Sequence, residues 1–360
     1  TGYGKSIYIN HLDGTTSVYA HLKTFSSKIE KIIKFYQYEK EIFEIKKFFK
    51  TNEVSIFKGE IIGYSGNTGG SFGPHLHFEI RETESQAPIN PLKFGYSVKD
   101  TKKPRVNGLY IYNLDNNKKF KSGDNKKTLI LNKLSDSLYE AESIKLGGAF
   151  GFGIQMYDQQ NLSYNKNGVY QTRLYVNENE IFNLIFDRFL FSDSKYINYL
   201  IDYKAYREEK IKINKLYLSK IGDFSFLGPT INDGKLFFLE GKKYNIKIEL
   251  FDYNNNKTVL RLLVEGTIPN LINSIPLKGE FIDINIKKKF EYENKEVTFL
   301  KNSFFENQII KIINKKDTLI VDNSNSPLNK PIKVVFKLSK LDSTTSQLGI
   351  GIINKSNKNI

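Results

Sequence analysis

The sequence contains no cysteine, and this absence excludes several kinds of chemistry at once. A chain without thiols has no cysteine nucleophile, no cysteine-ligated zinc and no disulfide framework, although its compartment stays undecided. Long apolar stretches are absent too, since no run reaches the ~18 residues that a membrane helix needs. The chain opens at Thr1 without a methionine, so the missing signal peptide says nothing about export.

Histidine is scarce, with four in 360 residues, yet two of the four stand one residue apart. His75 and His77 lie in residues 73–81, a run that predicts a strand, so both imidazoles point to the same face. A third, His21, lies where another predicted strand ends. Imidazole serves both as a zinc ligand and as a proton carrier, so this concentration predicts a chemical site. A His-x-His pair by itself is equally compatible with packed or surface histidines on a sheet.

A glycine-rich loop over residues 58–74 runs directly into the histidine pair. Its composition resembles a phosphate cradle, but it lacks the Gly-Lys-Ser/Thr ending and precedes a strand where a helix would be needed. We therefore expect its glycines to let the backbone turn sharply and to leave a groove open beside the histidines.

Six motifs follow one another along the first quarter of the chain. They are Gly2-Tyr3-Gly4, Ile7-Tyr8-Ile9-Asn10-His11, Tyr19-Ala20-His21-Leu22, Lys58-Gly59, Ile62-Gly63-Tyr64-Ser65-Gly66-Asn67-Thr68-Gly69 and Gly73-Pro74-His75-Leu76-His77-Phe78-Glu79. In this order they resemble the lysostaphin-type zinc metalloendopeptidases, and the resemblance ends near residues 90–92. It implies an antiparallel β peptidase domain with one Zn²⁺, acting on peptide cross-links of peptidoglycan in the bacterial cell envelope.

The same resemblance implies that His77 is a metal ligand. It implies that His21 and His75 are catalytic residues that flank the metal-bound water and either stabilise the transition state or relay protons in it. His11 matches a position that the family does not use for catalysis. Zinc lowers the pKa of its water to about 7 and polarises the scissile carbonyl, so no serine or cysteine nucleophile is required.

The chain departs from that family in its metal ligands. The family takes two zinc ligands from an upstream His-x-x-x-Asp, and this spacing occurs nowhere in the sequence. His75 and Glu79 are four apart, but on a strand this is about 13 Å, too far to chelate one ion. We therefore expect the chain to be the C-terminal part of a peptidase domain, binding zinc weakly and hydrolysing poorly by itself. Two alternatives stay open, namely a non-catalytic lysostaphin-like envelope protein that binds or regulates wall hydrolases, and a β-rich adhesion or scaffolding protein.

A second departure is an insertion at residues 25–51, where the family has a short connection. Apolar residues recur at i, i+3, i+4 and i+7, at Ile29, Ile32, Ile33 and Tyr36. This spacing predicts an amphipathic helix over 26–38, followed by an extended stretch over 41–49. Seven lysines make the insertion basic, so it is either a wall of the substrate groove, a contact with an anionic envelope surface, or a solvated lid packed on the sheet.

The remaining sequence predicts a mainly β protein. After Pro91, short alternating runs separated by Asn, Asp, Gly and Lys turns are typical of β-sandwiches. The clearest runs are 109–114, 127–131, 168–176, 244–251 and 259–264. We predict three domains: 1–98, the C-terminal part of the peptidase domain; 99–268, a β-sandwich-like accessory domain; and 269–360, a β-rich C-terminal segment or domain. The strand aromatics are expected to fill cores, the alternative being stacking on glycan rings.

Charge gives the last indication. The chain has 54 lysines and arginines against 39 acidic residues, a net charge of +15. Such a balance attracts polyanions, and an anionic cell wall or outer-membrane surface is the partner we expect. A nucleic acid is not expected, because no recognised binding motif occurs and the lysines are spread along the chain.

Overall fold

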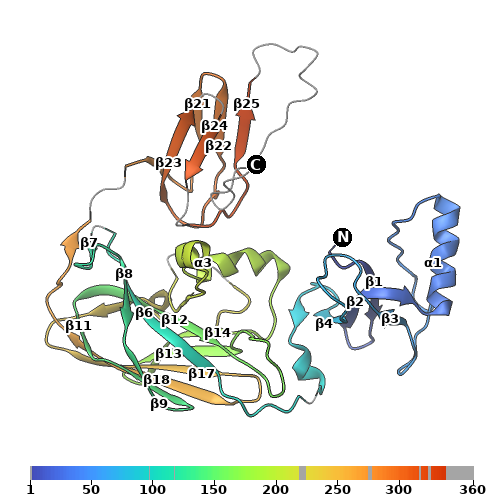
Figure 1. Ribbon diagram of the computed structural model, residues 1–360, viewed down its shortest axis with the longest axis horizontal. Coiled ribbons are helices and arrows are strands. Elements are labelled where there is room, and N and C mark those ends of the chain that lie inside the picture. Colours follow the sequence, from blue (N-terminus) through green and yellow to red (C-terminus); the bar gives the residue numbers. More distant parts are fainter. Residues whose placement is uncertain are drawn as a thin grey trace.

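The alternating runs of the sequence form strands throughout the computed structural model, which is mainly β (Figure 1). The structure describes residues 2–96, 98–116, 118–218, 224–274, 278–315, 318–322 and 326–337. Three groups of sheets follow one another along the chain, coloured blue, green to yellow, and orange to red in Figure 1. Within the described residues, no helix has the length and apolar character needed to cross a membrane.

The first group is a five-stranded antiparallel sheet that positions the histidines. Its strands are β1 (Lys5–Asn10), β2 (Thr15–Phe25), β3 (Gly63–Ser65), β4 (His77–Glu82) and β5 (Pro88–Ile89). The long strand β2 is central, since it pairs with β1, β3 and β4. A short 3₁₀ helix, Pro91–Phe94, then ends this part of the chain. The sheet buries few apolar side chains, among them Val18, Ala20 and Ile80.

Glycines join the glycine-rich loop to the first residues of the chain. Gly4 and Gly69 both have positive φ, of +59° and +76°. A Cβ on Gly69 would lie 2.3 Å from the backbone nitrogen of Gly4. The amide of Gly70 also donates to the carbonyl of Gly2 at 2.8 Å. These glycines therefore bring two backbone segments into contact, while the groove expected beside the histidines stays a prediction.

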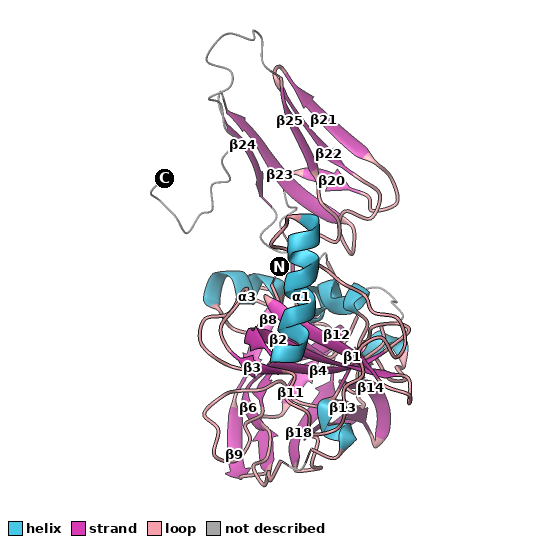
Figure 2. Ribbon diagram, turned by 90° about the vertical axis from the view of Figure 1, so that its right-hand side faces the viewer, coloured by secondary structure: helices cyan, strands magenta, loops and turns pink. Residues whose placement is uncertain are grey.

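The predicted helix of the insertion is confirmed as α1 (Ser27–Lys40), which ends at Glu41 in the left-handed region with φ of 54°. Figure 2 shows α1 in front of β2 and β3 and extending past the sheet. Ile29 is its one buried residue, while Phe35 and Tyr38 are 64% and 82% exposed. Ile32, Ile33 and Tyr36 of the predicted apolar stripe are half-buried, so the stripe is less exposed than Phe35 and Tyr38 beside it. The prediction of an extended stretch at 41–49 is wrong, because no strand forms there.

The second group contains two sheets that share one core. The larger has the order β14 (Asn179–Ile185), β13 (Gln171–Val176), β17 (Lys243–Phe251), β18 (Lys257–Gly266), β10 (Leu138–Ala141) and β9 (Leu131–Ser135), with β11 (Ile144–Leu146) also on β18. The smaller has the order β15 (Asn214–Lys215), β12 (Gly148–Tyr157), β6 (Arg105–Asn113) and β8 (Lys126–Leu129), with β16 (Leu236–Phe238) on β12. Ile111 of β6, Phe152 of β12 and Ile248 of β17 belong to the same buried cluster. The two sheets therefore share one buried core, and the β-sandwich-like domain stays a prediction.

Short helices follow β14. They are the 3₁₀ helix Phe191–Tyr196, α2 (Ile197–Leu200) and α3 (Tyr203–Glu209), and a further 3₁₀ turn spans Asn232–Gly234. Tyr199 and Leu200 of α2 belong to the shared core, whereas α3 packs on the outer face of the smaller sheet. Tyr110 and Tyr112 of β6 pack there with Ala205 of α3. Two-residue strands β7 (Lys118–Lys119) and β19 (Ile272–Asn273) pair at the edge of this group.

The third group consists of two three-stranded sheets. One has the order β20 (Glu280–Ile282), β23 (Gln308–Lys315) and β24 (Thr318–Asp322), and the other β21 (Lys288–Tyr292), β22 (Lys295–Phe299) and β25 (Lys333–Phe336). Phe299 and Phe304 are fully buried in its core, as Phe150, Phe152 and Phe182 are in the second group. The prediction that strand aromatics fill cores is confirmed for four of these, since Phe304 lies in an isolated bridge outside the named strands. The predicted domain bounds 1–98, 99–268 and 269–360 stay predictions, and residues 275–277 and 338–360 lie outside the described part.

A pair of glycine substitutions tests the backbone contact. Gly14 has φ of +83° and open space around its Cα, whereas Gly69 combines positive φ with the contact to Gly4. We expect Gly14→Ala to cost about 1 kcal/mol of stability through backbone strain alone. Gly69→Ala should cost roughly 2 kcal/mol more, because the backbones must separate. Amide hydrogen exchange of β1 and β2 measures both, and equal costs would contradict the contact.

Candidate functional site

Three histidines meet on one face of the first sheet. The ring of His21 lies 4.9 Å from that of His75 and 5.4 Å from that of His77, centroid to centroid. His77 begins β4, and His75 precedes it in an isolated bridge with Gly66. His21 is buried at 6% exposure, while His75 is exposed and the side chain of His77 is 35% exposed. The cluster is therefore anchored at one side and open to solvent at the other.

The backbone of β2 turns His21 toward this cluster. Ala20 pairs with His77, so in a regular strand the next residue, His21, would point to the opposite face. The pairing of β1 with β2 instead shifts register between Lys5 and Ile7, and His21 has φ of 57°. A bulge with a left-handed residue re-aims a side chain in this way, at a conformational cost of about 1–2 kcal/mol.

Backbone carbonyls determine which nitrogen of His21 and His75 carries the proton. Nδ1 of His21 lies 2.8 Å from the carbonyl oxygen of Thr68, and Nδ1 of His75 lies 2.8 Å from that of Gly73. A carbonyl only accepts, so both Nδ1 atoms must donate. In their neutral forms, His21 and His75 therefore each keep a lone pair on Nε2.

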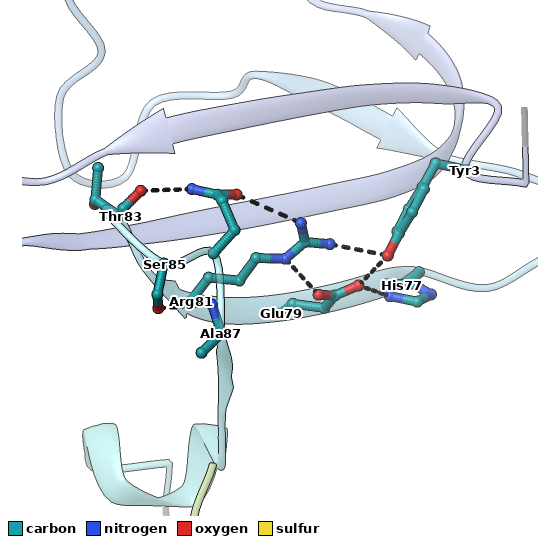
Figure 3. Close-up of polar contacts among 8 residues, drawn as sticks. Tyr3, His77, Glu79, Arg81, Thr83, Ser85 and Ala87 are labelled. Carbon is teal, nitrogen blue, oxygen red and sulfur yellow. Dashed lines mark hydrogen bonds and ion pairs between the residues drawn. The ribbon is translucent and has the colours of Figure 1, made fainter. Parts of the chain in front are cut away.

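His77 has the opposite arrangement. Its Nε2 lies 2.5 Å from Oε1 of Glu79, two residues along the same strand and on the same face (Figure 3). An ionised carboxylate only accepts, so Nε2 donates and the lone pair of neutral His77 is on Nδ1. Carboxylates hold zinc-binding histidines in this manner, fixing the tautomer and the ring orientation.

Glu79 is the centre of a hydrogen-bonded network (Figure 3). Tyr3 donates its hydroxyl to Oε1 at 2.9 Å, and Nε of Arg81 donates to Oε2 at 2.7 Å. Arg81 also donates from Nη2 to the Tyr3 oxygen at 2.8 Å. Burial alone would raise the pKa of Glu79, but the hydrogen bonds from Arg81, His77 and Tyr3 outweigh it and lower that pKa below its ordinary value. Glu79 is therefore ionised at neutral pH.

Arg81 connects this network to the second group of sheets. It is 6% exposed, and its guanidinium lies 4.8 Å from the ring centre of Phe191. Desolvation would lower the pKa of Arg81, but the hydrogen bond to Glu79 raises it. Nearby, Lys93 pairs with Asp187 at 2.8 Å. The site face of the first sheet thus packs on a loop that follows β14.

The structure brings His21, His75 and His77 together, as the sequence predicts. His11 is elsewhere, with Nε2 hydrogen-bonded to Ser17 at 2.8 Å. We excluded Glu79 as a metal ligand, and in the structure it instead accepts a hydrogen bond from His77. The alternation of His77, Glu79 and Arg81 along one strand could have indicated this contact, because it places all three side chains on one face. Tyr3 and Thr68 carried no such signal, because they reach the site from separate loops.

The donor set matches part of a zinc site. Imidazole is a preferred zinc ligand, and the carboxylate on Nε2 leaves Nδ1 of His77 free to bind a metal. Among the described residues, however, the three histidines do not form a group of ligand atoms all within 4.8 Å of one another. His77 therefore fits as one ligand, with further ligands required to complete the coordination.

Comparison with known proteins places a peptidase-family match over the histidine pair. Residues 32–91 match the model of Peptidase family M23, a range that includes His75 and His77 but not His21. The chain is 34% identical over 91 residues to a protein described as DD-carboxypeptidase/endopeptidase Mpg from Neisseria meningitidis serogroup B (strain ATCC BAA-335 / MC58). A protein of the same description from Neisseria gonorrhoeae (strain ATCC 700825 / FA 1090) is 33% identical over 91 residues.

Each match covers 25% of this chain and 15% of the relative. The chain therefore spans only a small part of the length of the curated relatives that it matches. The family resemblance seen in the sequence is confirmed for this N-terminal quarter.

Substitution of His21 tests the strained backbone apart from any chemistry. Alanine and glycine both remove the ring and its hydrogen bond to Thr68, but only glycine adopts positive φ without steric cost. We expect His21→Gly to be more stable than His21→Ala by about 1 kcal/mol. Thermal unfolding or hydrogen exchange of β2 gives the difference. If alanine were the more stable variant, His21 would not occupy the left-handed region.

Proposed function

We propose that this chain is the histidine-bearing part of a zinc metalloendopeptidase that hydrolyses peptide cross-links of peptidoglycan in the bacterial cell envelope. The observation that carries the proposal is the convergence of three imidazoles, each with one nitrogen held by a fixed acceptor. The match to a peptidase family over the same segment supports it. So does the described activity of the relatives, which act as carboxypeptidase and endopeptidase by name.

His77 would hold the metal through Nδ1. Glu79 keeps the proton on Nε2 and holds the ring in place, and Tyr3 and Arg81 hold Glu79 in turn. A bound zinc ion would supply a water of lowered pKa and polarise the scissile carbonyl. Loss of such an orienting carboxylate typically costs 10–100-fold in metal affinity or activity.

His21 and His75 would handle protons beside the reacting carbonyl. Each presents Nε2, which accepts a proton as the neutral ring and donates one as the imidazolium. One ring takes the proton of the attacking water, and an imidazolium stabilises the negative charge that develops on the carbonyl oxygen. As the C–N bond of the amide breaks, the same proton passes to the leaving amine. Because His21 is buried and His75 is exposed, substrate would approach from the open side of the cluster.

The charge of the chain suits an anionic envelope surface. The net charge is +15, and α1 carries exposed basic and aromatic side chains. Long-range attraction of this kind raises the encounter rate with a polyanion and weakens with salt. We assign the second and third groups of sheets to positioning or binding.

A second candidate is a non-catalytic relative that binds the wall or regulates wall hydrolases. One observation favours it: among the described residues, the histidines do not belong to a group of three ligand atoms close enough together to hold one metal ion. This candidate predicts binding to peptidoglycan without cleavage, and binding that survives substitution of His77.

Hydrolysis by the natural full-length protein that contains this chain is the test. Purified peptidoglycan is incubated with the protein, and released fragments are identified by chromatography and mass spectrometry. We expect cleavage of peptide bonds, inhibition by a zinc chelator, and a loss of roughly 100-fold or more for His77→Ala, His75→Ala and His21→Ala.

The matched control is His11→Ala, whose ring bonds Ser17 away from the cluster and whose removal should leave the rate unchanged. Cleavage that persists in His77→Ala would contradict the proposed site. Binding without any cleavage would instead support the non-catalytic relative.

A further inference from the structure

Three aspartates meet where the connection from the first group reaches the second group of sheets. Asp100 precedes β6, Asp158 follows β12, and Asp252 lies in the turn between β17 and β18. One carboxylate oxygen of each lies within 4.8 Å of those of the other two. Three segments at least 58 residues apart in the sequence thus bring their carboxylates together.

The charge of nearby Lys102 acts to lower the pKa of Asp158, but Lys102 forms no ion pair with the three aspartates. Among the described residues, no lysine or arginine forms an ion pair with Asp100, Asp158 or Asp252 within 4.0 Å. The neighbouring Lys102 directs Nζ to the carbonyl of Gln160 at 3.0 Å instead. Asn256 donates Nδ2 to Asp252 at 2.6 Å, but this neutral donor removes no charge.

Asp158 supplies an independent indication of a ligand. The residue is 6% exposed, and its Oδ1 is buried without a hydrogen-bond partner. Its backbone is fully engaged, since N–H and C=O both pair with Asn167. A buried unpaired carboxylate oxygen is rare in native proteins and requires a partner. Burial raises the pKa of Asp158 to about 6, and the charges of Asp252 and Asp100 act in the same direction.

We propose that Asp100, Asp158 and Asp252 bind a hard divalent cation, with Ca²⁺ as the expected ion. Carboxylate oxygens are the donors that calcium and magnesium prefer, whereas zinc and copper favour nitrogen or sulfur. Calcium accepts irregular sets of six to eight oxygens, which suits ligands drawn from a linker, a strand end and a hairpin turn. Water and backbone carbonyls would complete its coordination.

The proposed cation would fasten the connection between the first and second groups of sheets. That connection already lies along the hairpin of Asp252, because Asn256 donates to the carbonyl of Asp100 at 3.1 Å and Thr258 to that of Pro104 at 2.6 Å. An ion that bridges Asp100 to Asp158 and Asp252 adds a direct link at the same place. Calcium would thereby hold the histidine-bearing sheet in a fixed relation to the accessory sheets.

Calcium titration of the chelator-treated chain tests the proposal without reference to hydrolysis. We expect one Ca²⁺ per chain by isothermal titration calorimetry, with a rise in melting temperature, and competition by Mg²⁺. Trypsin cleavage after Lys99 and Lys102 should slow in calcium. The result does not depend on the histidine site, so it stands apart from the proposed function.

Asp158→Asn is the decisive variant. It removes the unpaired buried charge, so the cation-free protein should melt at or above the wild-type temperature while calcium affinity falls at least tenfold. Asp136→Asn is the matched control. The Asp136 side chain is 84% exposed beside Lys133 in the same group of sheets, so this variant should bind calcium normally. Asp100→Asn provides a second test and should also weaken binding tenfold. Absence of binding at millimolar calcium and magnesium, or unchanged affinity in both cluster variants, would overturn the proposal.

Discussion

The first sheet depends on one carboxylate, that of Glu79, shared among His77, Tyr3 and Arg81. The sheet has a small apolar core, so this polar network takes a larger part in holding it together. Removing one partner of a buried charged pair typically costs 3–5 kcal/mol, because the other charge is left uncompensated. The network also reaches beyond the sheet, since Arg81 lies against Phe191 of the second group. One interaction therefore links the orientation of His77, the stability of the sheet and the contact between two parts of the chain.

Strand alternation was sufficient to predict that His75 and His77 share a face, because that information is local to the residues themselves. The helix α1 followed from apolar spacing for the same reason. The position of His21 could not be derived in this way. It depends on a bulge that arises from pairing between β1 and β2, and on a left-handed backbone that no residue type near His21 demands. The contribution of Glu79 was missed because we considered it only as a direct ligand.

The same limit applies to the accessory sheets. The runs at 244–251 and 259–264 predicted β17 and β18, since alternation and the intervening turn residues are local signals. The parallel pairing of β10 and β11 with β18 has no such signal. Likewise, Asp100, Asp158 and Asp252 stand in separate segments with no common motif. Chemistry that needs three distant segments appears only once tertiary pairing is known, whereas the histidine pair is visible in a single strand.

The central claim is that fixed acceptors assign the proton on each histidine, leaving Nδ1 of His77 and Nε2 of His21 and His75 for chemistry. Nuclear magnetic resonance of the ring nitrogens tests it most directly, at a pH above the ordinary imidazole pKa, where four histidines give a simple spectrum. We predict the Nε2–H tautomer for His77 and the Nδ1–H tautomer for His21 and His75. A His77 ring protonated on Nδ1, or His21 protonated on Nε2, would contradict this assignment of the site.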